Sequence, residues 1–426
     1  MSEMSYLEKL LDGVEVEWKT LGEVAKYVRG LIYSKSSESA DGQGYKVLRA
    51  NNITLSNNCL NLNDVKVVRF DTKVKSSQKL YKNDILISAA SGSREHVGKV
   101  AYIESDIDYY FGGFMGVVRC DEKLNPRYLF HVLTSDIFQK YLDEMLNSST
   151  INNLNSAVMG RFKIPLPCPD NPEKSLAIQS EIVRILDKFT ALTAELTAEL
   201  TAELSMRKKQ YNYYRDQLLS FKEGEVEWKA LGEIGEVRMC KRILKSQTSS
   251  EGEIPFYKIG TFGKEPDSYI SRKLFNEFKE KYSYPKVGEV LISASGTIGR
   301  TVIFDGRESY FQDSNIVWIE NNEKIVLNKY LFYFYKIAKW GISEGGTIKR
   351  LYNDNLRKLM IPVPFPDSPE RSLVEQQKIV KLLDKFDALT NSITEGLPRE
   401  IELRQKQYEY YRDLLFSFPK PETISN

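Results

Sequence analysis

The feature that most constrains this chain of 426 residues is an internal duplication. The segment "IPLPCPDNPEKSLAIQSEIVRILDKFTALT", from Ile164, is matched by "IPVPFPDSPERSLVEQQKIVKLLDKFDALT", from Ile361. The match continues to Phe221 and Phe418 at a constant offset of 197 residues (361 − 164 and 418 − 221). A repeat of this length predicts one structural unit used twice, with approximate two-fold symmetry.

Upstream of these segments the similarity between the halves is confined to short islands. "EVEWKTLGEV" from Glu15 returns as "EVEWKALGEI" from Glu225, and "DILISAASGS" from Asp84 returns as "EVLISASGTIG" from Glu289. Each half therefore has a divergent front and a closely repeated back.

The fronts mix two kinds of pattern. Runs such as "YKVLRA", "VKVVRF", "DILISAA", "EVLISAS" and "SNIVWIE" are typical of strands, whereas "NPRYLFHVLTSDIFQKYLDEML" and "NKYLFYFYKIAKW" are typical of helices. We expect an α/β (α+β) fold with two similar globular domains joined by two long antiparallel coiled-coil helices. The predicted boundaries are 1–163 and 222–360 for the globular domains, and 164–221 and 361–426 for the helical segments.

The backs carry apolar residues at coiled-coil spacing. In the first half these are Ile178, Ile182, Ile185, Phe189, Leu192 and Leu196, and in the second Ile379, Leu382, Phe386, Leu389 and Ile393. A continuous helix from Ser175 to Phe221 would be about 70 Å long at 1.5 Å per residue.

The word Thr-Ala-Glu-Leu occurs three times between Thr193 and Leu204. The spacing of four residues predicts a leucine seam in a spacer helix through Leu192, Leu196, Leu200 and Leu204. One word adds about 6 Å of helix and about 40° beyond a full turn. In the second half Gly396 and Pro398 interrupt the pattern, and an interior proline costs about 3 kcal/mol, so a kink is expected there.

Composition narrows the class of protein. The net charge is only +2, so any basic surface must be local. The four cysteines show no CxxC spacing and there are two histidines, which argues against a metal site or a disulfide framework. The start of the chain lacks the apolar segment of a leader and no run is long enough to span a membrane, so we expect a cytoplasmic protein.

These features together resemble the specificity subunit of a type I restriction-modification system, in the class whose central helix carries tandem TAEL words. The resemblance rests on the duplicated "IPLPCPDNPEKS" and "IPVPFPDSPERS" linkers, on "ILDKFTALTAEL" and "LLDKFDALTNSI", on the paired "YYRD" tails, and on "WKTLGE" with "WKALGE". It covers essentially the whole chain.

The resemblance implies a function in double-stranded DNA recognition. Each front would be a target-recognition domain that reads one half of a split sequence, and the helices would fix the gap between the halves. The chain would have no catalytic site and no cofactor of its own. It would dock two methyltransferase subunits that use S-adenosylmethionine and, in the full complex, two restriction/translocase subunits that use ATP and Mg²⁺.

Candidate DNA contacts follow from side-chain chemistry, since arginine and asparagine can form bidentate bonds to bases and hydroxyl or basic groups bind phosphates. Four kinds of stretch qualify: the Gly/Ser turn after a strand in each front, the Thr-bearing turn before each linker, one asparagine pair and one basic run. Their candidates are Arg49, Asn51, Asn52, Ser91, Ser93, Arg94, Lys99, Thr150, Asn152, Asn153, Lys241, Arg242, Lys245, Ser295, Thr297, Arg300, Thr347, Lys349, Arg350 and Tyr352. Each could instead form an ordinary turn or a solvated surface.

Two other interpretations remain open. Asp267, Glu277 and Lys279 follow the PD…ExK order of magnesium-dependent nucleases, in which two acids hold the metal. Here, however, they lie in a charged stretch that reads as a surface helix and has no counterpart in the first half. A purely structural coiled-coil protein is also conceivable, but it would leave the two long fronts without a role.

Overall fold

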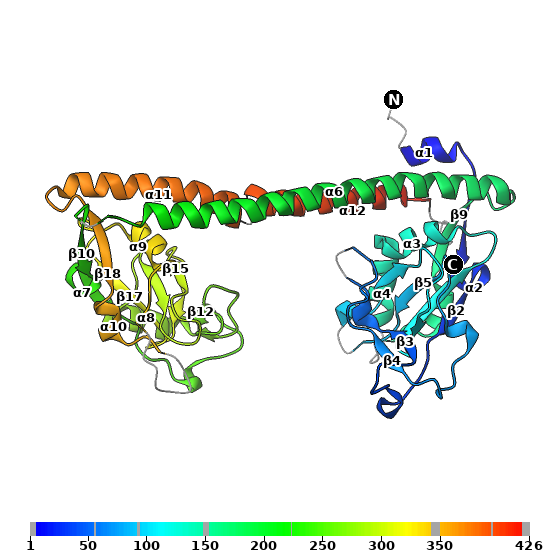
Figure 1. Cartoon of the computed structure of the whole chain (residues 1–426), viewed down its shortest axis with the longest axis horizontal. Coiled ribbons are helices and arrows are strands. Elements are labelled where there is room, and N and C mark those ends of the chain that lie inside the picture. The colour runs from blue at the N-terminus through cyan, green and yellow to red at the C-terminus, as the bar shows by residue number, and fades with distance from the viewer. Residues whose placement is uncertain are drawn as a thin grey trace. The chain divides into compact units, whose positions relative to one another are not determined.

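The computed structural model describes residues 6–54, 57–91, 94–147, 153–222, 224–341, 350–392 and 395–419 (Figure 1). They form two compact units, which we call unit 1 (within residues 1–198 and 402–426) and unit 2 (within residues 199–401). Unit 1 therefore combines the beginning of the sequence with its end, whereas unit 2 is one continuous stretch of sequence. These units cut across the expected helical segments, and the domain boundaries drawn from the sequence stay a prediction.

Unit 1 contains three sheets that differ in size. An antiparallel pair joins β1 (Val16–Thr20) to β9 (Lys163–Pro167). A four-stranded antiparallel sheet has the order β2 (Ala25–Arg29), β8 (Met115–Cys120), β5 (Ile85–Ser88), β6 (Val100–Tyr102). A three-stranded sheet has the order β4 (Lys66–Val68), β3 (Tyr45–Leu48), β7 (Tyr110–Phe111).

Unit 2 repeats these three sheets strand for strand. The pair is β10 (Val226–Ala230) with β18 (Met360–Pro364). The four-stranded sheet has the order β11 (Gly235–Arg238), β17 (Ile316–Asn321), β14 (Val290–Ser293), β15 (Thr301–Ile303). The three-stranded sheet has the order β13 (Tyr269–Ile270), β12 (Ile254–Tyr257), β16 (Tyr310–Phe311). The predicted mixture of helix and sheet in two similar units is confirmed.

The helices of the two fronts correspond only in part, and the exceptions are α1, α4 and α8. The first front contains α1 (Tyr6–Leu11), α2 (Leu21–Val24), α3 (Pro126–Thr134), α4 (Asp136–Asn147) and α5 (Ser156–Arg161). The second front contains α7 (Leu231–Ile234), α8 (Arg272–Lys281), α9 (Asn328–Tyr335) and α10 (Asn353–Arg357). The repeated backs form α6 (Pro172–Leu218), α11 (Pro369–Asn391) and α12 (Gly396–Leu415). Helix α6 begins where the Asn171 side chain accepts the N–H of Lys174 at 3.0 Å, a typical N-terminal cap followed by proline.

A buried glutamine fastens each long helix to its unit. The Gln179 side chain on α6 accepts the N–H of Asn125 at 2.8 Å and donates to the carbonyl of Lys123 at 3.2 Å. In unit 2 the Gln376 side chain on α11 accepts the N–H of Leu327 and donates to the carbonyl of Ile325, both at 2.9 Å. Because a buried amide without partners is costly, these bonds fix the helix against the loop that precedes α3 or α9.

Two turns further along, an aspartate makes a second attachment. The Asp187 carboxylate accepts from Arg127 Nε at 3.0 Å and lies 2.8 Å from His131 Nε2, both on α3. Its equivalent Asp384 accepts from Lys329 Nζ at 2.7 Å and Tyr333 OH at 2.6 Å, both on α9. The geometry is shared, but the donors differ between the units.

The long helices have two apolar faces rather than the single predicted seam. The face that packs on the globular part buries Ile182 and Leu186 in unit 1 and Ile379 and Leu383 in unit 2. The prediction is wrong at Leu192, which is 51% exposed, and at Leu382, which is 41% exposed. Leu196, Leu200 and Leu204 are half-buried.

The second face brings helices together through one repeated aromatic contact. In unit 1 the rings of Phe189 on α6 and Tyr411 on α12 stack at 5.8 Å. In unit 2 the rings of Tyr214 on α6 and Phe386 on α11 stack at 5.6 Å. Both pairs occupy the same positions of the repeat. In each unit, the earlier part of one repeated helical segment therefore packs against the later part of the other.

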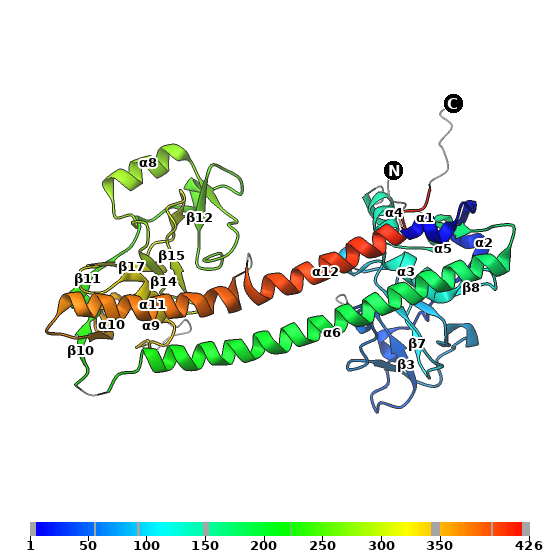
Figure 2. The same ribbon diagram turned by 90° about the horizontal axis from the view of Figure 1, so that it is seen from above.

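The second repeat contains a helix break where a kink was expected. Helix α11 ends at Asn391 and α12 begins at Gly396, whereas α6 is continuous (Figure 2). Gly396 has a φ of +78°, and a Cβ there would lie 2.5 Å from the carbonyl oxygen of Ala388. Pro398 falls in the first turn of α12, where its missing N–H leaves no hydrogen bond unmade.

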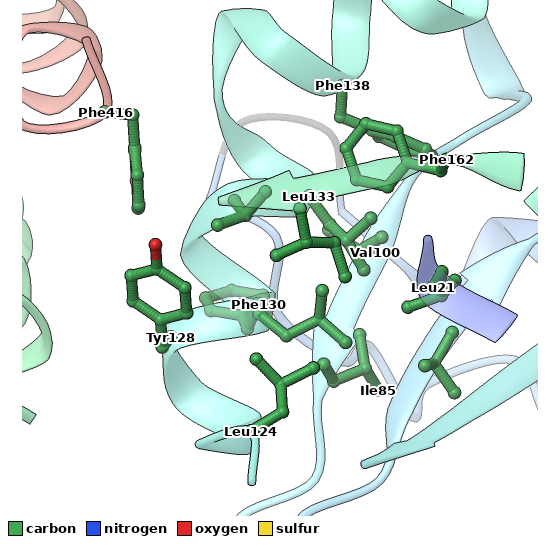
Figure 3. Packing of buried hydrophobic residues seen from close by; sticks show 14 of the residues in the cluster. Leu21, Ile85, Val100, Leu124, Tyr128, Phe130, Leu133, Phe138, Phe162 and Phe416 are labelled. Atoms are coloured by element: carbon green, nitrogen blue, oxygen red, sulfur yellow. The ribbon is translucent and has the colours of Figure 1, made fainter. Parts of the chain in front are cut away.

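The end of the chain completes the core of unit 1. Phe416 lies beside the Tyr128 ring, with 5.7 Å between the ring centres (Figure 3). The Trp18 indole N–H donates to the carbonyl of Pro419 at 2.8 Å. In unit 2 the equivalent of Phe416 is Leu219, buried at the end of α6. Each core is thus closed by a helix end.

We predict that acid weakens unit 1 through His131. Burial lowers the pKa of His131 although Asp187 acts in the opposite direction, so between that lowered pKa and about 6.5 the unfolded chain binds the extra proton. Stability is therefore full above about pH 6.5 and falls as the pH drops below it. His131→Tyr should keep the bond to Asp187, as Tyr333 does for Asp384. It should remove the part of the stability of unit 1 that is lost in acid.

Urea unfolding followed by limited proteolysis of unit 1 at a series of pH values measures this effect. Tyr333→Phe is the control, because it removes the corresponding bond in unit 2 without altering a group that titrates near neutral pH. An acid sensitivity that persists in His131→Tyr would assign it to another group.

Candidate nucleic-acid interface

In each unit the structure brings two of the predicted stretches together. The turn after β5 meets the segment before α5 through a β-bridge between Ala90 and Asn153. The turn after β14 meets the segment before α10 through a bridge between Ser295 and Arg350. We call this meeting point the loop junction of each unit, and it also includes the residues just before β8 or β17.

Arg29 organises the loop junction of unit 1. Its guanidinium, at the end of β2, donates to Asn153 Oδ1 at 3.1 Å and to the carbonyl of Gly113 at 3.1 Å. The strand end can approach this loop because residue 30 is glycine, and a Cβ at Gly30 would collide with the carbonyl oxygen of Gly112. Sequence reasoning missed Arg29, whose only signal is a basic residue before a glycine.

Asn315 organises the loop junction of unit 2. Its Oδ1 accepts from Ser295 Oγ at 2.7 Å and from Arg350 Nη2 at 3.4 Å. Nearby, Arg242 Nε donates to Asp313 Oδ2 at 2.9 Å. The structure therefore places Arg242, Ser295 and Arg350 around one loop, and it adds Asp313 and Asn315, which sequence reasoning missed.

Other candidates in the second front stabilise the turn or lie on the surface. Arg300 is half-buried and donates to the carbonyl of Phe262 at 2.9 Å, while its N–H donates to Ser293 Oγ at 2.9 Å. Thr297 is exposed in the same turn. This turn therefore offers Thr297 to a ligand more readily than Arg300.

Three further candidates of unit 2 are exposed. The Lys241 ammonium lies 5.0 Å from the centre of the Tyr282 ring. Lys245 begins a short 3-10 turn, and Tyr352 directly precedes α10. A basic group suits a contact with a DNA phosphate, and an aromatic ring suits a contact with a DNA base.

In the first front the basic residues of the glycine turn lie apart from Asn153. Arg94 forms an ion pair with Asp143 on α4 at 2.7 Å. Lys99 lines a hollow with Asp136 and Asp413. Ser91, which is half-buried, stays beside the bridge at Ala90. The predicted turn is thus divided between the loop junction and the α4 side of the unit.

The two asparagines of the predicted pair, Asn51 and Asn52, lie in different environments. Arg49 and Asn51 both contact Asp64 Oδ2 at 2.9 Å on the surface. Asn52 is 1% exposed, accepts the N–H of Arg49 and donates to the carbonyls of Asn61 and Asp64. The prediction that Asn52 presents its amide to DNA is wrong for this fold, because the amide holds the turn together.

Five predicted contacts lie outside the described residues. They are Ser93, Thr150, Asn152, Thr347 and Lys349.

The nuclease-like residues are occupied in separate local interactions. Asp267 pairs with Lys258 at 2.8 Å, and that contact lowers the pKa of Asp267. Glu277 pairs with Lys281 at 3.2 Å on α8, and the Lys279 ammonium lies over the rings of Phe275 and Tyr284. The expected surface helix is confirmed, and the arrangement of a two-acid metal site is not formed. Within the described ranges no group of three or more His, Cys, Asp or Glu side chains could hold a metal ion.

Among the described helices, none combines the length and apolar character needed to cross a membrane.

Comparisons with known proteins agree on one family. Residues 13–206 and 223–403 match the type I restriction modification DNA specificity domain. The chain is 50% identical over 424 residues to a Haemophilus influenzae protein provisionally named a type I restriction enzyme specificity subunit, covering 97% of this chain and 98% of that protein. It is 40% identical over 447 residues to the Escherichia coli EcoR124I/EcoR124II specificity subunit, covering 100% of both.

A solved structure has a similar fold. It comes from work on complex assembly and conformational transition of the type I R-M system. The TM-score is 0.61 at 16% identity, over 94% of this chain and 97% of the other.

We predict effects of different size on stability for the two neighbouring asparagines. Asn52→Ala should destabilise unit 1 by about 1–3 kcal/mol, because it leaves buried backbone groups without partners. Asn51→Ala should change the free energy of unfolding little, because Asn51 is exposed. Urea denaturation of both variants measures the difference, and equal stability of the two would show that the Asn52 bonds do not hold this turn.

Proposed function

Because the chain belongs to the family of type I restriction-modification DNA specificity subunits, we propose that unit 1 and unit 2 each bind one half of a split DNA sequence. The observation that carries this proposal is the loop junction, which is built twice on the same strands. Its loops combine hydroxyl, amide and guanidinium groups, the chemistry that binds bases and phosphates.

We propose further that the target is asymmetric. The bridge residue is Asn153 in unit 1 and Arg350 in unit 2, although the backbone contact is the same. An amide and a guanidinium prefer different base edges, since asparagine pairs with adenine and arginine with guanine. The two half-sites should therefore differ.

The chain would act without catalysis of its own, by positioning two methyltransferase subunits for adenine methylation. S-adenosylmethionine would belong to those subunits, and ATP with Mg²⁺ to two restriction/translocase subunits that join them. The repeated helix ends support a partner bound twice, because both expose the same tyrosine: Tyr213 on α6, 61% exposed, and Tyr410 on α12, 64% exposed. Exposed aromatic groups of this kind are frequent in protein interfaces.

The first test is to purify the full chain with its methyltransferase partner and to methylate a random DNA library. We expect one adenine-containing consensus made of two different half-sites with a fixed gap. Methylation without a split consensus would contradict the proposal. The isolated chain with DNA and Mg²⁺ is the control, and cleavage that disappears in Asp267→Ala would instead indicate a nuclease.

The second test concerns the TAEL words of α6. Deleting Thr197 to Leu200 shortens a helix by about 6 Å, which is of the order of one or two base pairs. We predict a shorter gap between unchanged half-sites, measured by sequencing the methylated sites. Glu199→Gln, which keeps the helix length, should leave the gap unchanged. Altered bases in either half-site of the deletion variant would count against a role for α6 as a spacer.

A further inference from the structure

Two apolar side chains stand out on the surface of unit 1. Ile32 is 88% exposed and Phe114 is 73% exposed, the highest values among the large hydrophobic residues of the described chain. A folded chain gains nothing by holding such groups in water, so their position relative to the loop junction is informative.

Phe114 belongs to the loop junction of unit 1, and Ile32 lies directly beside it. Leu31 forms a parallel bridge with Gly112, and Ile32 Cγ1 lies 3.0 Å from where a Cβ on Gly113 would be. The carbonyl of Phe114 accepts the N–H groups of Ala89 at 2.8 Å and Ala90 at 3.0 Å. Ile32 and Phe114 are therefore attached at neighbouring backbone positions.

The candidate DNA-binding groups adjoin this apolar pair on the same loops. Arg29 donates to the carbonyl of Gly113, directly before Phe114, and also contacts Asn153. The backbone of Ala90 also forms a β-bridge with Asn153. The apolar pair is thus continuous with the polar groups that the proposed function assigns to DNA.

Unit 2 has polar residues at the two equivalent positions. Ile32 and Arg242 each lie three residues before a short 3-10 turn, Lys35–Ser37 or Lys245–Gln247. Phe114 and Asn315 each directly precede a strand of the four-stranded sheet. The same two places thus carry an apolar pair in one unit and a hydrogen-bonding pair in the other.

We propose that Ile32 and Phe114 read the 5-methyl group of thymine in the half-site bound by unit 1, whereas Arg242 and Asn315 read hydrogen-bonding base edges in the other half-site. The inference rests on the proposed function. The thymine methyl is the apolar group that the major groove presents, and aliphatic and phenyl side chains are its usual partners. The half-site of unit 1 must then contain thymine.

Replacement of thymine by deoxyuridine tests the proposal, because it removes the methyl group and keeps the base pair. The full chain with its methyltransferase partner is titrated with duplexes that carry deoxyuridine at one target position at a time. The half-site whose base preference changes in Arg242→Ala is assigned to unit 2. We expect about fourfold weaker binding for a position in the other half-site, the effect of about one buried CH₂-sized group.

A double substitution, Ile32→Ser with Phe114→Ser, completes the cycle. Both side chains are exposed, so the variant should fold, and its affinity for the thymine duplex should fall to that for the deoxyuridine duplex. Phe70→Ser is the matched control, since Phe70 is 64% exposed in unit 1 and packs on Tyr45 outside the loop junction. It should retain the full deoxyuridine effect.

Three outcomes would overturn the assignment of these residues. They are a unit 1 half-site without thymine, binding that is insensitive to deoxyuridine throughout that half-site, and a deoxyuridine effect of unchanged size in the double variant. In each of these cases split-sequence binding persists and the proposed function stands. Loss of all sequence preference in the unsubstituted complex would instead refute the proposed function and this inference with it.

Discussion

The architecture depends on how each long helix is fastened to its globular part. On each long helix a buried glutamine and, two turns later, an aspartate bind α3 or α9 and the loop before it. These residues are Gln179 and Asp187 in unit 1 and Gln376 and Asp384 in unit 2. Buried amide and partly buried carboxylate groups require defined partners, so they fix the helix in rotation as well as in position. Apolar packing alone would let the helix slide along the globular part, because it is not directional.

This attachment uses none of the residues of the loop junction, so the loops can differ without affecting it. The backbone bridge is retained in both units while its side chains change from Asn153 to Arg350. Arg29 is likewise replaced as the organising residue by Asn315. A constant scaffold with exchangeable loops suits a protein whose two halves bind different sequences.

Local patterns predicted most of the fold, because strand and helix periodicities and the repeat are visible in single segments. The seam was misassigned at Leu192 and Leu382, since heptad spacing does not distinguish a face that packs on a sheet domain from one that packs on another helix. Asn52 was misassigned because a turn-holding amide and a base-reading amide have the same sequence. Arg29 and Asn315 reach the loop junction through strand pairing, which only tertiary structure reveals.

The placement of Phe416 in the core of unit 1 has a consequence for synthesis. Unit 2 is one stretch within residues 199–401, whereas unit 1 also needs residues that are synthesised after every residue of unit 2. The usual order, in which the N-terminal domain is finished first, is therefore reversed. The first front therefore keeps part of its core uncovered until α12 has been made.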